Sequence, residues 1–325
     1  MRIRSLASGL VVLALTVSDQ AAGTAPDKST AILAAARKAI GDRNLESLKT
    51  LSVEASLQRN VNTMQLTSEV EILLELPDKY LRSDVSSGGG PMAGGFSMGF
   101  NGDKPIRPAN SGSLSGGAMI IRMGPGGALP PGEKLSAEDQ QRADAQMLRS
   151  ARADVSRLML GWFATVHPAV VAEYTYAGEA ESPDGKAHVV DAKTADGFAA
   201  RLFIDQQTNL PLMVTYQGPQ PRIMTAGGPR SGGPGAAGER RAPPRELSDE
   251  ERKKAREDAE KQLHALQQQP PAMVEFTLFF DDWREVGGVK FPHKMRRASA
   301  GATNEEWTVT RVKVNPKFDA KKFEG

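Results

Sequence analysis

The stretch MVEFTLFFDDWREVGGVKFPHKM, residues 273–295, has the pattern of two strands joined by a tight turn. Apolar side chains occupy every second position of its first half, at Val274, Phe276, Leu278 and Phe280. This period of two is typical of a half-buried strand, because successive side chains point to opposite faces of a sheet. The Gly287-Gly288 turn is too short for the crossover that parallel strands need. We therefore expect antiparallel strands at 273–281 and 289–298.

The same alternation extends along the chain on both sides of this hairpin. It marks strands around 51–57 and 70–74. In the second half, closely spaced turn residues such as Pro183-Asp184-Gly185 and Asp196-Gly197 separate further apolar runs. The strands predicted there are 171–180, 187–193, 199–204, 212–217 and 305–315. Turns this close favour hairpins, so the sequence predicts one large antiparallel sheet.

Helical patterns interrupt this sheet. The strongest begins at Ser136, whose Ser-x-x-Asp pattern with Asp139 is typical of a helix N-cap, and apolar residues recur every third or fourth position as far as Phe163. Other helices are predicted over 27–40, over about 248–267 with mostly charged side chains, and as a short turn over 319–323.

Glycine and proline concentrate in two segments. Residues 86–133 hold 14 Gly and 6 Pro in 48 positions, and a similar tract begins at residue 217. Such segments bury too little apolar surface to offset the entropy lost on ordering. We interpret 86–133 and 217–272 as flexible insertions in a single domain of residues 24–325, with part of the first forming strand and the second including the charged helix.

Residues 1–23 have the pattern of a cleaved leader. Arg2 and Arg4 precede an apolar run of about 12 residues, Leu6–Val17, which is shorter than the roughly 20 needed to span a bilayer. The sequence therefore predicts export to the periplasm or the medium, without a membrane span. A net charge of +2 gives no reason to expect binding to nucleic acid.

Catalytic motifs are weak. The sequence contains no cysteine, so thiol nucleophiles are absent. None of its histidines, His 4 in all, has the spacing of a zinc site. GFSMG at 95–99 matches GxSxG, but it lacks the strand-turn-helix context of a nucleophile elbow, and GxGxxG at 233–238 lacks a βαβ unit. Asp281 and Asp282 are consecutive strand residues, so they point to opposite faces. We expect no enzyme, no metal and no cofactor.

A sheet of this size has more apolar surface than one helix can cover. The excess must close on itself, bind a partner or enclose an apolar ligand, and flexible methionines with large aromatic side chains suit acyl chains. The same residues can equally form an ordinary core. The candidate lining residues are Met64, Leu66, Phe203, Met213, Tyr216, Phe276, Leu278, Phe280, Trp283 and Trp307.

Four segments together resemble one known family. They are LELPDKYLR at 74–82, FNGD at 100–103, RLFIDQQTNLPL at 201–212 and FDDWREVGGVKFP at 280–292. The chain resembles the outer-membrane lipoprotein-sorting (LolA/LolB-like) superfamily over about 27–85 and 140–320. The family-like positions are Arg82, Phe203, Asp205, Pro211, Trp283 and Pro292.

This resemblance implies an α+β fold, a curved antiparallel β half-barrel with helices against its concave face. It also implies non-covalent carriage of lipid, acyl chains or a lipoprotein. We therefore hypothesise a periplasmic, non-enzymatic carrier, which requires a concave face that side chains do not fill. The alternative is an envelope scaffold that binds a partner protein through its inserted segments; deleting 87–133 and 218–268 separates the two.

Overall fold

The hairpin at 273–295 forms as the sequence predicts. In the computed structural model, β10 (Met273–Val286) pairs antiparallel with β11 (Val289–Ser299), and Val286 lies opposite Val289. The structure describes residues 25–61, 64–86, 95–106, 136–183, 185–220 and 272–324. The predicted leader at 1–23, the GxGxxG match at 233–238 and the charged helix at about 248–267 lie outside these residues.

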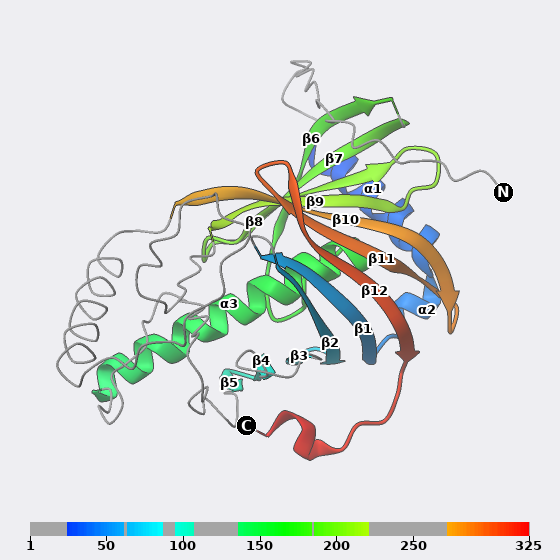
Figure 1. Ribbon diagram of the computed structural model, residues 1–325. Helices are drawn as coiled ribbons and strands as arrows, with labels where there is room; N and C mark the ends of the chain where they lie inside the picture. The colour runs from blue at the N-terminus through cyan, green and yellow to red at the C-terminus, as the bar shows by residue number, and fades with distance from the viewer. Residues whose placement is uncertain are drawn as a thin grey trace, which may run out of the picture.

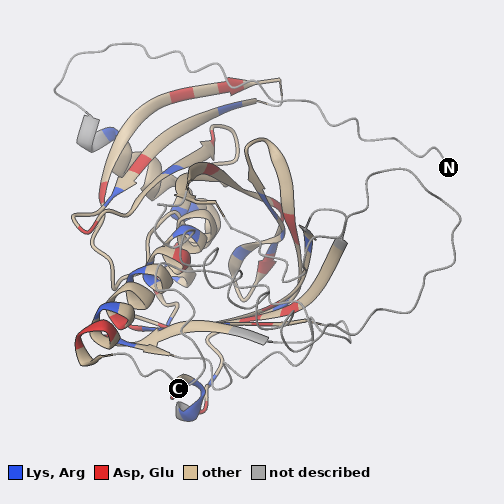
Figure 2. Ribbon diagram, turned by 60° about the vertical axis from the view of Figure 1, so that its left-hand side comes forward, with Lys and Arg blue, Asp and Glu red and all other residues tan. Residues whose placement is uncertain are grey.

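All strands of the described chain belong to one sheet, in the order β5-β4-β3-β2-β1-β12-β11-β10-β9-β8-β7-β6, and each neighbouring pair is antiparallel. The sheet is open, with β5 and β6 at its edges, and it curves around α3 (Figure 1, Figure 2). This confirms the predicted curved antiparallel half-barrel. The remaining strands are β1 (Thr50–Val61), β2 (Met64–Glu75), β3 (Lys79–Ser86), β4 (Gly95–Asn101), β5 (Lys104–Ile106), β6 (Glu173–Ser182), β7 (Gly185–Lys193), β8 (Ala199–Asp205), β9 (Pro211–Pro219) and β12 (Ala302–Val314).

The long helix α3 (Ala137–Phe163) crosses the concave side of the sheet (Figure 1). The hydroxyl of Ser136 accepts a hydrogen bond from the backbone N–H of Asp139, so the predicted cap is present, and Ala164 ends the helix in the left-handed conformation. The helix touches β4 and β5 near one edge of the sheet and β8, β9 and β10 on the other side. It therefore links the two arms of the half-barrel.

Three shorter helices complete the described fold. Helix α1 (Ala25–Ile40) packs against β6 and β11, close to the range predicted from the sequence. It is followed by the single turn α2 (Arg43–Glu46), and a 3-10 turn, Ala320–Phe323, lies near β3 at the C-terminal end. The buried side chains of α1 join the same core as those of α3.

Part of the first Gly-rich segment forms strand, as the sequence predicts, because β4 and β5 belong to the sheet. Phe100 of β4 is fully buried. A Cβ at Gly99 would lie 2.1 Å from the backbone oxygen of Tyr80, so this glycine allows close approach of β3. Gly102 has φ +59 in the β4–β5 turn. These glycines are required by the strand geometry and do not mark a linker.

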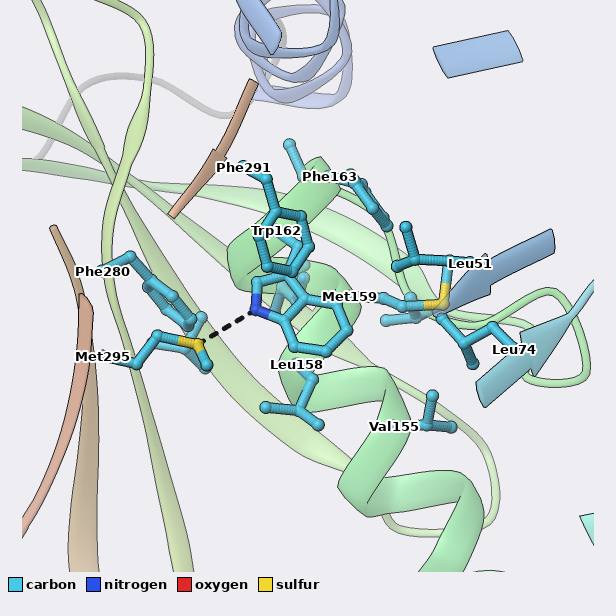
Figure 3. Packing of buried hydrophobic residues seen from close by; sticks show 14 of the residues in the cluster. Leu51, Leu74, Val155, Leu158, Met159, Trp162, Phe163, Phe280, Phe291 and Met295 are labelled. Carbon is cyan, nitrogen blue, oxygen red and sulfur yellow. Dashed lines mark hydrogen bonds between the residues drawn. The ribbon is translucent and has the colours of Figure 1, made fainter. Parts of the chain in front are cut away.

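The core lies between the C-terminal half of α3 and the sheet (Figure 3). Trp162 is fully buried with its ring 4.9 Å from that of Phe291, and its Nε1 donates a hydrogen bond to Met295 Sδ over 3.2 Å. Phe163 and Met159 pack on the same part of the core. The concave face is thus filled over much of its area by side chains of α3.

Candidate functional site

A small cavity of about 20 Å³ remains between α3 and the strands of the concave face. Room of this size holds about one or two water molecules, and an acyl chain does not fit without displacing side chains. The cavity is lined from β3, α3, β9, β10, β11 and β12. The lining residues are Arg82, Asp154, Arg157, Leu158, Tyr216, Leu278, Phe280, Met295, Arg296, Arg297, Glu305 and Trp307.

Four of the residues proposed from the sequence as a ligand lining meet at this cavity: Tyr216, Leu278, Phe280 and Trp307. Phe276 is not part of the lining but stacks on Tyr216, with ring centroids 5.4 Å apart. The alternation of β9, β10 and β12 brings these side chains to one face of the sheet. They form the apolar wall of the site.

The other predicted lining residues lie elsewhere. Phe203 and Met213 form a separate cluster with Ala180, Ala187 and Val189. Because Leu202 and Ile204 on either side of Phe203 belong to the main core, this cluster lies on the opposite face of the sheet. A period of two shows that alternate residues share a face, but it does not show which face is concave. The sequence therefore placed Phe203 and Met213 together with the residues at the cavity.

Three further candidates have different surroundings. Trp283 packs partly against the main core, opposite Pro292 on β11. Leu66 is half-buried on β2, opposite Arg59 of β1. Met64 begins β2, and its side chain lies outside the described residues.

Beyond the apolar wall, the concave face carries a network of ion pairs. Arg59 bridges two buried carboxylates, at 2.6 Å from Asp84 and 2.9 Å from Glu305. Arg82 also binds Asp84 over 2.8 Å, and Arg297 binds Glu305 over 2.6 Å. Burial alone would raise the pKa of Asp84, but Arg82 and Arg59 outweigh it and the pKa lies below its ordinary value. Asp84 is therefore ionised at neutral pH.

Asp154 connects this network to α3. Its carboxylate accepts a hydrogen bond from the hydroxyl of Tyr80 over 2.7 Å and lies 3.5 Å from Nη1 of Arg82. Burial raises the pKa of Tyr80, and the charge of Asp154 raises it further, so Tyr80 remains a hydrogen-bond donor. Arg82 also lies over the ring of Trp307, with 4.6 Å from its Cζ to the ring centroid.

Arg157 lies one turn further along α3, and its guanidinium rests on aromatic rings. Its Cζ is 4.1 Å from the ring centroid of Tyr216 and 5.9 Å from that of Phe198. Nε of Arg157 is buried and has no hydrogen-bond partner among the described residues. Burial lowers the pKa of Arg157; Arg297 adds to this shift, whereas Tyr216 and Asp154 oppose it.

The sequence reasoning did not find Asp154, Arg157, Arg297 or Glu305. A signal was available in the patterns themselves. Glu305 stands two residues before Trp307 in a strand whose alternate positions are apolar, and Arg157 follows Val155 and Ser156 in the buried half of α3. A charge at such a position indicates either an ion pair in the interior or a ligand.

The remaining family-like positions support the strands. Oδ1 of Asp205 accepts hydrogen bonds from Thr208 N, Thr208 Oγ1 and Gln207 N, at 2.6, 2.7 and 3.1 Å, and so holds the turn between β8 and β9. Pro211 begins β9 directly after this turn. Both residues act in the architecture of the sheet.

The weak catalytic motifs form no catalytic arrangement in the described chain. Ser97 lies in the middle of β4, with its Oγ 3.3 Å from Oγ of Ser83, whereas a nucleophile elbow needs a strand-to-helix turn. Asp282 is paired with Arg284 over 2.6 Å, and Asp281 lies 3.5 Å from Arg296. The residues the structure describes contain no cluster of His, Asp or Glu suited to a metal, and none of their helices is long and apolar enough to cross a membrane.

No protein-family model and no curated protein matches the chain. Among solved structures, it is similar to a LolA superfamily protein from Nitrosomonas europaea, with 9% identity, TM-score 0.45 and coverage of 91% of this chain and 97% of that one. A DUF1329 family protein from Desulfovibrio piger has 13% identity, TM-score 0.41 and the same coverages. A domain from Vibrio parahaemolyticus named for outer-membrane lipoprotein sorting has 9% identity, TM-score 0.43 and coverages of 92% and 97%.

The superfamily that the sequence motifs resemble is the same one that two of these solved structures are named for.

Proposed function

We propose that this protein is a non-enzymatic carrier of the periplasm, which binds the acyl chain of a lipid or lipoprotein in the concavity of its half-barrel. The observation that carries the proposal is the cavity between α3 and the sheet, walled by Tyr216, Leu278, Phe280 and Trp307. Aromatic and branched apolar side chains around unfilled space are typical of sites for apolar ligands. The predicted leader at 1–23 supports a location in the periplasm.

Binding of an acyl chain requires the site to widen, and α3 supports such a movement. Every buried residue of this helix lies between Ala151 and Phe163, whereas its first half, from Ala137 to Ser150, has none. The first half projects away from the sheet (Figure 1). The cavity is lined by Asp154, Arg157 and Leu158, just inside the anchored half.

A segment with few buried contacts separates from the body at a low free-energy cost. Displacement of the first half of α3 would open a path to the end of the cavity at Asp154, while Trp162 and Phe163 keep the rest of the helix anchored. An acyl chain entering there would lie against Leu158, Leu278 and Tyr216 of the cavity lining. Its apolar surface would be buried against these side chains.

The first test is extraction of the protein, purified from its native envelope without detergent, followed by mass spectrometry of the extract. A stoichiometric lipid is the expected result. The stripped protein should also take up a fluorescent fatty acid. An empty protein that takes up no fatty acid would refute the carrier and favour the envelope scaffold, for which pull-down of a partner should fail when 87–133 and 218–268 are deleted.

A pair of variants links uptake to this cavity. Leu278→Trp places a larger side chain into the lining and should reduce fatty-acid uptake about tenfold or more, because a ring in the cavity excludes the ligand. Leu212→Trp is the matched control, since Leu212 lies on β9 and is 41% exposed. Thermal unfolding of both variants verifies that each is folded. Equal uptake by the two variants would place the ligand elsewhere.

A further inference from the structure

The arginines that line the cavity differ in whether they have a carboxylate partner. Four arginines line it, and three of them have a carboxylate within 4 Å, whereas Arg157 forms no ion pair and no hydrogen bond with any described residue. The pairs are Arg82 with Asp84, Arg296 with Asp281, and Arg297 with Glu305. Arg157 is therefore the one arginine of the lining with no carboxylate in ion-pair contact among the described residues.

The nearest carboxylate on the same helix is already engaged. Asp154 accepts a hydrogen bond from Tyr80 and lies beside Arg82. What Arg157 does contact is the face of Tyr216, at 4.1 Å. A cation over an aromatic ring is favourable, but the ring accepts no hydrogen bond along the N–H directions of the guanidinium. The donors of Arg157 are thus left for a group that is not part of the described protein.

A second donor lies at the same cavity without a partner among the described residues. Nε of Arg297 is buried and unsatisfied, although its Nη2 binds Glu305. Buried donors without acceptors are rare in folded proteins, because such a donor loses its hydrogen bonds to water and gains none in return. Two unsatisfied guanidinium nitrogens on the lining of one cavity point to a bound acceptor.

We infer that this cavity holds the anionic head group of the ligand, a carboxylate or a phosphate, bound by Arg157 with Arg297 as the second donor. The inference rests on the proposed function and makes it more specific, because it selects an anionic amphiphile over a neutral one. The room of about 20 Å³ takes one or two oxygens of such a group, and the acyl chain would follow the wall of Tyr216 and Leu278 as the site widens. Guanidinium groups bind both anions through paired N–H donors.

The test compares three ligands of equal chain length by isothermal titration calorimetry at pH 8, below their aggregation concentrations. Palmitate carries a carboxylate, 1-palmitoyl lysophosphatidate carries a phosphate, and hexadecanol carries neither. We expect the wild-type full-length chain to bind at least one anion about tenfold to a hundredfold more tightly than hexadecanol. The tighter of the two anions identifies the source of the head group.

The variants isolate the role of the charge. Arg157→Met should remove the preference for the anion and leave the affinity for hexadecanol, whereas Arg157→Lys should restore part of it. Arg149→Met, an exposed position earlier on α3, should change neither affinity.

Three outcomes would overturn the inference. Equal affinities for all three ligands, unchanged in Arg157→Met, would refute the anion site and leave the carrier intact. Loss of hexadecanol binding together with anion binding in Arg157→Met would show that this side chain only maintains the cavity. Absence of binding of every ligand to the wild type would refute both the anion site and the proposed function.

Discussion

Nε1 of Trp162 donates a hydrogen bond to the thioether of Met295 over 3.2 Å, and this contact ties α3 to β11 in the most deeply buried part of the core (Figure 3). Both side chains are almost fully buried, so neither has water as an alternative partner. The indole N–H is a donor that must be satisfied inside the protein.

Met295→Leu keeps the volume of the side chain and removes the acceptor. We expect the free energy of unfolding to fall by about 1–3 kcal/mol, the cost of leaving a buried donor unsatisfied. Met159→Leu is the matched control, because Met159 is equally buried and its sulfur accepts no hydrogen bond from a described residue. Chemical denaturation measures both. A loss no larger in Met295→Leu than in the control would mean that this hydrogen bond contributes nothing.

Glu305 holds two arginines on the concave face, and its removal should strongly destabilise the fold. Glu305→Gln leaves Arg297 without its carboxylate and Arg59 with Asp84 as its one remaining partner in these pairs, and we expect a loss of about 3–5 kcal/mol. Glu306→Gln, at the neighbouring exposed position, should change stability by less than about 0.5 kcal/mol. Urea denaturation measures the free energy of unfolding of both variants. Similar losses in the two would show that the ion pairs of Glu305 do not contribute to stability.

His167 should make stability depend on pH in the mildly acidic range. Burial, with a smaller effect of Arg152, lowers the pKa of His167 to about 4, against an unfolded value of about 6.5. Between these values the unfolded chain binds more protons than the folded one. Stability is therefore complete above pH 6.5 and falls as the pH drops towards 4, by roughly 3 kcal/mol in all.

Protonation of His167 would also break a hydrogen bond in the folded protein. Nδ1 of His167 accepts a hydrogen bond from the backbone N–H of Ala169 over 3.1 Å, and a proton on Nδ1 would abolish it. His167→Asn keeps an acceptor and removes the titration, so its unfolding free energy should change less between pH 6.5 and 4. His293→Asn is the control, on β11. A variant with the wild-type pH profile would assign the acid sensitivity to other groups.

Gly161 provides a test of packing between α3 and β10. A Cβ at this position would lie 1.9 Å from Cζ of Phe280, so Gly161→Ala should destabilise the protein by about 1–3 kcal/mol despite the better helix propensity of alanine. Phe280→Leu frees the space that the ring occupies. Gly161→Ala should therefore cost less stability when it is added to Phe280→Leu than when it is made in the wild type. Strictly additive effects in thermal unfolding would contradict this contact.

The periodic parts of the sequence predicted the fold well. Alternation at Val274–Phe280 and the Gly287-Gly288 turn predicted β10 and β11, and the cap at Ser136 predicted the start of α3. In contrast, the composition of 86–133 predicted a flexible insertion with part of it in strand but did not locate that part, because composition does not distinguish a glycine needed for close approach to Tyr80 from one in a flexible chain.

The site was predictable only in part. Tyr216 and Trp307 were identified from residue type and spacing, whereas Phe203 and Met213 were grouped with them although they face away. The face of each strand depends on strand order and curvature, and these arise from pairings between residues hundreds of positions apart. Arg157 was missed because its meaning depends on which side chains surround its guanidinium, and only the three-dimensional arrangement reveals them.

The pairing of β1 with β12 has a consequence for how this chain reaches its native state. The centre of the sheet is formed by the first and last strands in the sequence, with Arg59 opposite Glu305. Contacts between such distant residues must overcome a large loop-closure entropy, and they slow folding. Until residues after 302 have emerged, β1 and β11 both present unpaired backbone edges, which invite association with other chains. The sheet therefore cannot be completed before β12 has been made, and β12 is the strand that joins two separate β-meanders into a single body.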